Sequence, residues 1–282
     1  YRRQRQMCIR DRKYWGHMNL RERVDRFFIA QFEGLPLDQA DEMDILEANG
    51  TVNFGSNKAY RAMLKKIKAG SPATNPDDLQ YILDNVDVDN LFEYMALEMF
   101  VGNSDIGNIR YYRLHQEGSK WKWIWYDADY GLYSSKFNSP WSYLKVKGMG
   151  EQKIDNTIFL KLLEHPDYKR KFLEKLADVY KTFTTEYMTQ VLDGVLAEIQ
   201  PEMKNHWERW GELNDKAVTS EVPTTIDGAY TYWESRVNRL YNTVKVRPHR
   251  LWDFIKDEFK LTKTEMEELF GPQPDYPDDA VL

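Results

Sequence analysis

The sequence is poor in the residues on which several kinds of site depend. It contains a single cysteine, Cys8, and five histidines. One cysteine excludes an intramolecular disulfide and any zinc site built from several thiolates. The histidines are scattered, and no two have the i, i+4 spacing with an adjacent glutamate that is typical of a helical zinc protease site. The sequence therefore does not indicate a site that depends on thiol or histidine chemistry.

Long apolar runs and a dominant charge are also missing. No segment approaches the roughly 20 apolar residues that a membrane helix needs, so we predict no membrane span in this chain. The net charge of −6 argues against a protein held on nucleic acid by phosphate contacts. No GxSxG or GxxxxGK[ST] motif occurs, so the α/β-hydrolase and P-loop classes have no support. With 42% hydrophobic and 14% aromatic residues, the chain has ample material for a globular core.

The first twelve residues differ from the rest of the chain. The string YRRQRQMCIRDR is rich in arginine and shows neither a helical nor a strand period. We expect residues 1–12 to be a non-native leader; the alternative is a short basic arm. On this interpretation Cys8 supplies no nucleophile or metal ligand. We also expect the natural protein to continue upstream, so the missing signal peptide says nothing about localisation.

The remaining sequence predicts a mixed α and β domain. Residues 14–20 are typical of a strand end, and two strands at 109–115 and 120–127 form a hairpin around a glycine-containing loop. Residues 36–56 are loop-like, with a turn at Asn49–Gly50. Apolar spacing and stop signals predict helices over 21–35, 58–68, 77–83, 91–101, 156–164, 167–181, 184–207, 228–244 and 248–258. Residues 263–282 are expected to form an acidic, proline-rich tail.

The predicted helix 91–101 is apolar almost all round. Only Glu93 and Glu98 interrupt it, and Gly102 and Asn103 end it. A helix without a polar face is a buried one. It therefore delivers Asp105 from the end of a rigid element.

Four polar residues lie where rigid elements end: Asp105, Asn108, Asp127 and Asp129. Phosphoryl transfer from a nucleotide needs a carboxylate at the acceptor hydroxyl, and an Asp and an Asn that hold Mg²⁺ against the phosphates. Antiparallel pairing of the hairpin is expected to return Asp127 and Asp129 to the loop of Asp105 and Asn108. The same residues also suit ordinary helix caps and turns, and spacing alone leaves both interpretations open.

Ordered blocks of sequence resemble the CotH kinase family, the spore-coat-type atypical protein kinases. The blocks are YWGHMNLRERVDRFF, VDVDNLFEYMALEMFVGNSDIGNIRYYRL, KWKWIWYDADYGLY, DNTIFLKLLEHPDYKRKFLEKLADVY, EMKNHWERW and RPHRLWDFIKDEF. The similarity runs from about residue 14 to about residue 260. It implies a CotH-kinase-like domain over residues 13–262, with a mostly helical C-terminal lobe, a small antiparallel hairpin and an incomplete N-terminal lobe.

The resemblance also implies a chemistry. Asp105 matches the catalytic aspartate of the family and Asp127 its Mg²⁺-binding aspartate, while Asn108 and Asp129 match neighbours in the same motifs and are expected to join the metal site. Glu22 matches an acidic position and is expected on the nucleotide side. The implied cofactors are ATP and Mg²⁺, and the implied substrates are Ser or Thr hydroxyls of coat or cell-surface proteins. The implied location is extracellular, at the cell surface or in the spore coat.

Two departures from the family pattern bear on activity. Only Ile106 and Gly107 separate Asp105 from Asn108, where family members often have a longer loop containing tryptophan. That shortening is expected to draw Asn108 away from the metal. The strands that carry a phosphate-contacting lysine in the family lie upstream of the first matching block. We therefore expect this chain to be an inactive fragment of an active parent.

Other functions remain open at this stage. A kinase-like domain without transfer activity would serve as a scaffold or binding module of a coat or extracellular assembly. Trp121, Trp123 and Trp125 share one strand face, which suits a sugar-stacking platform but better suits a buried hairpin face. The run from Asp84 to Asn90 resembles a Ca²⁺ loop without its required glycine and terminal glutamate, so helix capping is preferred.

Overall fold

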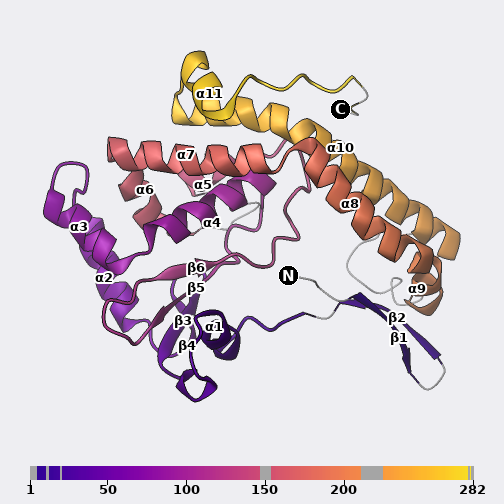
Figure 1. Cartoon of the computed structure of the whole chain (residues 1–282), viewed down its shortest axis with the longest axis horizontal. Helices are drawn as coiled ribbons and strands as arrows, with labels where there is room; N and C mark the ends of the chain where they lie inside the picture. The colour runs from indigo at the N-terminus through magenta and orange to yellow at the C-terminus, as the bar shows by residue number, and fades with distance from the viewer. Residues whose placement is uncertain are drawn as a thin grey trace. The chain divides into compact units, whose positions relative to one another are not determined.

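The computed structural model describes residues 5–10, 13–19, 21–146, 154–210, 225–278 and 280 (Figure 1). The chain divides into two compact units. Unit 1 comprises Tyr1–Arg23, Thr185–Lys245 and Asp279–Leu282, and unit 2 comprises Val24–Thr184 and Val246–Asp278. Four of the five predicted site residues belong to unit 2, and Glu22 belongs to unit 1.

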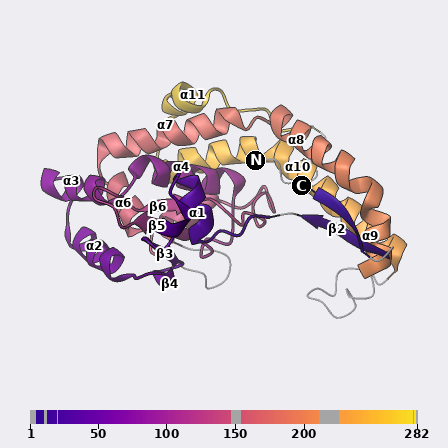
Figure 2. The ribbon, with the colours of Figure 1, turned by 60° about the horizontal axis from the view of Figure 1, so that its bottom comes forward.

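Unit 1 combines a β-hairpin with helices. Its elements are β1 (Arg5–Arg10), β2 (Lys13–Asn19), α8 (Thr185–Ile199), η2 (Gln200–Glu202), α9 (Met203–Trp210) and the first part of α10 (Ile226–Phe259). Arg5–Arg10, in which we saw no strand period, pairs antiparallel with β2. β2 lies along α9 (Figure 2), where the Trp210 indole donates to the Trp15 carbonyl at 2.9 Å. Gly16, with φ +110°, allows this approach, because a Cβ there would come within 2.6 Å of the indole nitrogen.

The sheet of unit 2 has four antiparallel strands rather than the two of the expected hairpin. They are β3 (Met43–Glu47), β4 (Thr51–Phe54), β5 (Arg110–Leu114) and β6 (Lys122–Ile124), in the order β4-β3-β5-β6. The loop prediction for 36–56 is therefore wrong, although the Asn49–Gly50 turn does join β3 to β4. β3 was missed because Met43, Ile45 and Leu46 are all fully buried, so the strand lacks the alternation that identifies a half-exposed strand.

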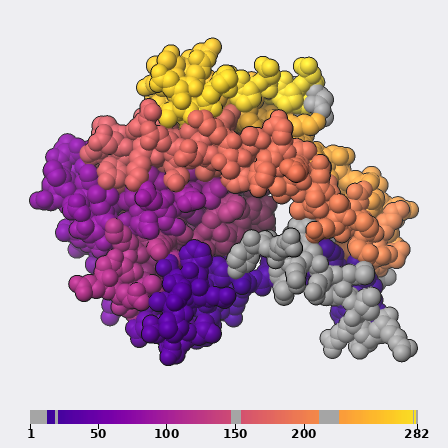
Figure 3. Space-filling view, in the orientation of Figure 1, coloured from indigo at the N-terminus to yellow at the C-terminus, as the bar shows by residue number. Residues whose placement is uncertain are grey.

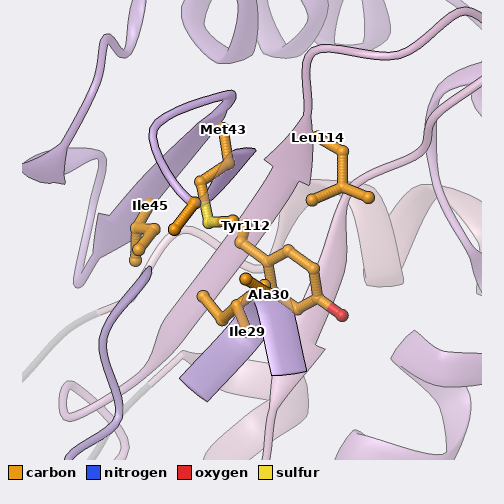
Figure 4. Packing of buried hydrophobic residues seen from close by; sticks show 7 residues of the cluster. Ile29, Ala30, Met43, Ile45, Tyr112 and Leu114 are labelled. Atoms are coloured by element: carbon orange, nitrogen blue, oxygen red, sulfur yellow. The ribbon is translucent and has the colours of Figure 1, made fainter. Parts of the chain in front are cut away.

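Helix α1 (Arg26–Phe32) covers one face of this sheet, together with Ala40, which follows the short η1 (Leu37–Gln39). Asp25 caps α1 by accepting from the backbone amides of Phe27 and Phe28. Figure 4 shows the packing beneath it, where side chains of α1, β3 and β5 meet. The buried cluster consists of Ile29, Ala30, Ala40, Met43, Ile45, Tyr112 and Leu114. This contact fixes β5, the strand that follows the predicted catalytic loop.

Aromatic rings cover the other face of the sheet. Tyr60 of α2 (Lys58–Ala69) contacts Tyr111 and Trp121 at ring-centroid distances of 4.7 and 5.0 Å. Trp123 stacks on Tyr111 at 5.5 Å. The exposed fractions are 0% for Trp121 and 6% for Trp123, whereas Trp125, beyond the end of β6, is 44% exposed. A sugar platform on this stripe is therefore excluded, and the buried-hairpin interpretation is confirmed for its first two rings.

The other helices of unit 2 pack in layers on the sheet. They are α3 (Pro76–Asn85), α4 (Val88–Val101), α5 (Ser139–Lys145), α6 (Thr157–Leu163), α7 (Pro166–Thr182), α11 (Lys263–Phe270) and the last part of α10. α4 lies between the sheet and α7 (Figure 1), and α11 lies against α7 (Figure 3). No helix in the described ranges combines the length and apolarity needed to cross a membrane.

Several helix boundaries differ from the predictions. α5 and α11 were not predicted, and α11 forms where a tail was expected. The predicted helix 184–207 is interrupted near Pro201 by η2, whereas the predicted break between 244 and 248 does not occur, because α10 continues through Pro248. A proline removes one helical hydrogen bond, yet α10 continues. At this turn the Tyr180 hydroxyl donates to the Pro248 carbonyl at 3.0 Å and ties α10 to α7.

The N-terminus of α4 is tied to the hairpin. Asp87 caps α4 by accepting from the Asn90 amide at 3.1 Å, which confirms capping over a Ca²⁺ loop. The Asn90 side chain accepts from the Trp123 backbone amide at 2.6 Å and donates to the Trp123 carbonyl at 3.1 Å. One amide side chain thus provides hydrogen-bond partners for both backbone groups of Trp123 on the edge strand β6.

We expect Asn90→Ala to lower the free energy of unfolding by about 2 kcal/mol, because it leaves backbone groups of Trp123 without partners. Urea unfolding followed by tryptophan fluorescence measures this loss. Asp89→Ala is the control: Asp89 is exposed and pairs with Lys171 at the surface, so its removal is expected to cost less than about 1 kcal/mol. Equal losses in the two variants would contradict the role assigned to Asn90.

Candidate functional site

The loop that carries Asp105 starts at the C-terminus of α4. Gly102 ends the helix in the left-handed conformation, with φ +65°, and its amide donates to the Glu98 carbonyl at 3.0 Å. The Asn103 side chain then accepts from the Asp105 backbone amide at 3.1 Å. Asn103 is buried and Asp105 is half-buried. The orientation of the Asp105 backbone is therefore set by a buried polar turn on a buried helix.

Asn108 and Asp127 meet across the hairpin. The Asn108 side-chain amide donates to Asp127 Oδ2 at 2.6 Å, and the Tyr126 hydroxyl donates to Asn108 Oδ1 at 2.8 Å. The expected return of Asp127 to the loop is thus confirmed, and the two-residue spacing after Asp105 does not separate Asn108 from Asp127. Asp127 has φ +54°, a conformation that aspartate and asparagine tolerate better than most residues.

The Tyr126 hydroxyl lies within the electrostatic reach of both Asp105 and Asp127. Burial raises the pKa of the Tyr126 hydroxyl, the negative charges of Glu47, Asp127 and Asp105 raise it further, and Arg110 opposes them. The Arg110 guanidinium lies 5.0 Å from the Tyr126 ring centroid and is paired with Glu47 at 3.1 Å. The charges of Asp105 and Asp127 thus both act on the Tyr126 hydroxyl, and the nearby guanidinium of Arg110 is shared with Glu47.

Asp129 and Glu22 stand apart from this constellation in different ways. Asp129 is exposed, and no hydrogen bond or ion pair joins it to Asn108 or Asp127 in the part of the chain that the structure describes. Glu22 is exposed and lies in unit 1, between β2 and α1. The metal role of Asp129 and the nucleotide role of Glu22 therefore remain predictions.

A buried carboxyl group lies beneath the loop. Glu98, on α4, is 1% exposed and accepts from the Tyr143 hydroxyl at 2.6 Å. Burial raises the pKa of Glu98, hydrogen bonds from Tyr143, Asn103 and Trp125 oppose that rise, and the charge of Asp105 adds to it. Glu98 therefore connects α4, the loop residue Asn103 and α5 through one carboxyl group.

The raised pKa of Glu98 makes a prediction about pH. The folded protein holds the proton more tightly than the unfolded chain, so its stabilising effect is complete below the unfolded pKa and is lost as pH rises through the folded pKa. We expect the stability of wild type relative to Glu98→Gln to decrease as pH rises from about 4.3, the model-peptide pKa. Thermal unfolding over a pH series measures this difference.

Glu93→Gln is the matched control, because Glu93 lies on the same helix and is exposed. It keeps Glu98 in place and so provides the baseline for the same pH series. If the difference between wild type and Glu98→Gln does not change with pH, Glu98 titrates in the folded protein as it does in the unfolded chain.

Sequence reasoning missed three residues of this site. Tyr126 orients Asn108, Asn103 orients Asp105, and Glu98 anchors the loop. A signal existed for Glu98, because a glutamate within a helix that is apolar all round must be buried and partnered. Tyr126 carried no comparable signal, since an aromatic residue in a strand is ordinary core material.

The oxygen donors of Asn108 and Asp127 suit a hard cation that takes its other ligands from the substrate and from water. Among the described residues, no group of three or more His, Cys, Asp or Glu side chains is arranged to hold a metal. Mg²⁺ is usually bound through one or two carboxylates together with waters and phosphate oxygens, and Asp127 with Asn108 provides such a partial set. The Asn108 amide now presents its nitrogen to Asp127. Rotation of the Asn108 side-chain amide by half a turn would place its oxygen on the side of Asp127 instead. The Tyr126 hydroxyl would then accept a hydrogen bond from the amide nitrogen rather than donate one.

A comparison with known families gave a match that covers most of the chain. The model of the family described as CotH kinase protein matches residues 7–251. The chain belongs to the CotH kinase family. The α+β kinase-like fold class is confirmed with it. The match starts within the expected leader, whose origin stays a prediction. Searches of curated proteins and of solved structures gave no match.

Proposed function

We propose that the full-length protein is a Mg²⁺-dependent protein kinase that transfers phosphate from ATP to Ser or Thr hydroxyls of coat or cell-surface proteins. Membership of the CotH kinase family supports a kinase-like function. The observation that carries the finer proposal is the contact of Asn108 with Asp127 beside Asp105. An acceptor-facing carboxylate next to an Asn–Asp pair is the arrangement with which protein kinases transfer phosphate from ATP.

Asp105 is the proposed acceptor-facing carboxylate. The acceptor oxygen forms a bond to the γ-phosphorus, the bond from that phosphorus to the β-phosphate oxygen breaks, and ADP leaves with the electron pair. The hydroxyl proton passes to Asp105, whose position is set by the bond from its backbone amide to Asn103.

Asn108 and Asp127 are the proposed metal ligands. Bound Mg²⁺ would neutralise charge on the phosphate oxygens. The chain's own part is to hold the two ligands in place: Tyr126 fixes the Asn108 amide, and the left-handed turn at Asp127 directs its carboxylate to Asn108. Asp129 is proposed as a further ligand and Glu22 as a nucleotide-side group, both from the family motif alone.

The test is transfer of label from [γ-³²P]ATP to dephosphorylated casein, a serine-rich acceptor, by the full-length protein. We expect Mg²⁺-dependent phosphoserine or phosphothreonine that disappears with EDTA. Label that appears equally with EDTA, or no label in the presence of bound Mg²⁺·ATP, would contradict the proposal.

One observation favours the second candidate, a non-catalytic scaffold of a coat or extracellular assembly. The Asn108 amide donates directly to Asp127 Oδ2, so these two side chains hold each other without a cation. A scaffold would show no thermal shift with Mg²⁺·ATP, whereas a kinase is expected to be stabilised by it.

A further inference from the structure

A charged side chain is completely buried behind the loop that carries Asp105. Arg247, on α10, has an exposed fraction of 0%. It makes no ion pair with any of the described residues. Burial lowers its pKa to about 9, which leaves the guanidinium charged at neutral pH. Burial of a charge without a counter-charge destabilises the folded protein unless hydrogen bonds compensate. The hydrogen-bond acceptors around Arg247 are therefore what stabilises its buried charge.

Two of those partners are carbonyls in the last turn of α4. Arg247 Nε donates to the Phe100 carbonyl at 3.1 Å, and Nη2 donates to the Met99 carbonyl at 2.9 Å. The C-terminus of a helix carries partial negative charge and four carbonyls without helical partners. A guanidinium at this position satisfies two of them and stabilises the end of the helix.

The same guanidinium also holds the segment that follows Asp127 and Asp129. Nη1 donates to the Phe137 carbonyl at 2.6 Å, and Nη2 donates to the Ser139 hydroxyl at 2.6 Å. Ser139 in turn donates to the Met99 carbonyl. One side chain therefore joins the end of α4, from which the Asp105 loop starts, to residues 137–139, which follow Asp127 and Asp129 in the chain.

Arg247 lies close against Gly102 at the end of α4. Gly102 has φ +65°, and a Cβ there would lie 2.9 Å from Arg247 Nη2. The Val101 carbonyl accepts from Leu132 at 2.6 Å, and the Glu98 carbonyl accepts from Gly102. All four terminal carbonyls of α4 thus have partners, and Arg247 supplies two of them.

We infer that Arg247 is a positioning residue for phosphotransfer: it holds the α4 end that delivers Asp105 and the segment that begins at Asp127 in one fixed arrangement. This inference rests on the proposed function for its catalytic consequence. Its physical part, the coupling of two segments through one guanidinium, has its own readout. Nothing in the arrangement requires Arg247 to touch substrate.

The experiment measures hydrogen–deuterium exchange and kinase activity of full-length wild type, Arg247→Met and Arg247→Lys. In Arg247→Met we expect at least about tenfold faster exchange in residues 102–108 and in 128–139 together, with α7 unchanged. Because a misplacement of about 1 Å can cost about 100-fold in rate, we expect kcat to fall by a similar factor and KM for Mg²⁺·ATP to change less.

Tyr180→Phe is the matched control, because it removes a buried hydrogen bond to Pro248, the next residue of α10. We expect wild-type exchange in both segments and wild-type kcat. Faster exchange in both segments of Tyr180→Phe would overturn the inference, since any loosening of α10 would then suffice. Wild-type exchange in both segments of Arg247→Met would also overturn it.

Arg247→Lys separates positioning from general stability and keeps the test valid if the methionine variant does not fold. Burial lowers the pKa of a lysine, so the stability of this variant relative to wild type is expected to rise with pH. Its relative kcat is expected to fall over the same range, because the cation is lost. If the stability and the kcat of Arg247→Lys instead changed in the same direction with pH, the loss of activity would follow general stability, and the positioning role of Arg247 would be contradicted.

Failure of the proposed function is distinguishable from failure of this inference. If wild type transfers no phosphate, the function fails, and the exchange data alone decide whether Arg247 couples the two segments.

Discussion

Asp127→Asn is expected to lower the rate of Mg²⁺-dependent phosphotransfer by a factor on the order of 10³, because a metal-held charge stabilises the transition state by several kcal/mol. Asparagine is the right substitution at this position. It tolerates the left-handed backbone at φ +54°, and its side-chain oxygen still accepts the hydrogen bond from Asn108. The variant therefore loses charge with little change in shape, and the melting temperature is expected to stay close to that of wild type.

Initial rates with labelled ATP, at several Mg²⁺ concentrations, measure this effect. Asp77→Asn is the control, since Asp77 is exposed in the first turn of α3, outside the site. The rate of Asp129→Asn is expected to fall between those of Asp127→Asn and Asp77→Asn, because Asp127 is hydrogen-bonded to Asn108 and Asp129 is not. A loss at Asp129 as large as that at Asp127 would make Asp129 an equal ligand. Unchanged rates in Asp127→Asn would remove Asp127 from the metal site.

Asp105→Asn is expected to lower kcat by about 10²- to 10⁴-fold, the range for loss of a general base. The substitution keeps the backbone amide bond to Asn103, so the loop should keep its conformation. Because Asp105 faces the acceptor in the proposal, the affinity for Mg²⁺·ATP should change much less than kcat.

Steady-state kinetics together with nucleotide binding separate the two aspartates. Asp105→Asn is expected to bind Mg²⁺·ATP and fail in transfer, whereas Asp127→Asn is expected to be impaired in both. Loss of nucleotide binding in Asp105→Asn with transfer retained at saturating ATP would reverse the assigned roles.

Much of the fold was predictable wherever local sequence carried a physical signal. The apolar run 91–101 with its glycine stop predicted α4, and the aspartates before it, Asp87 or Asp89, predicted a helix cap, which Asp87 supplies. β3 was not predictable by alternation, because it is buried on both faces. The continuity of α10 through Pro248 was not predictable from local sequence, because a proline normally ends or kinks a helix. The bond from Tyr180 that ties this turn to α7 is a long-range contact.

The sequence predicts the proposed reacting groups of the site, but not the residues that hold them in position. Asp105, Asn108 and Asp127 follow from the hairpin and from the family motifs, and the Asn108–Asp127 contact agrees with that expectation. Arg247 lies 142 residues from Asp105 in the sequence, so its place at the end of α4 is a property of the tertiary fold.

Binding of Mn²⁺·ATP to the full-length protein tests the central claim most directly, because Mn²⁺ takes the same oxygen ligands as Mg²⁺ and its free form gives an EPR signal. We expect wild type to deplete the free Mn²⁺ signal in the presence of ATP, and Asp127→Asn to deplete it at least about tenfold less effectively. Equal depletion by the two proteins would contradict a metal site at Asn108 and Asp127.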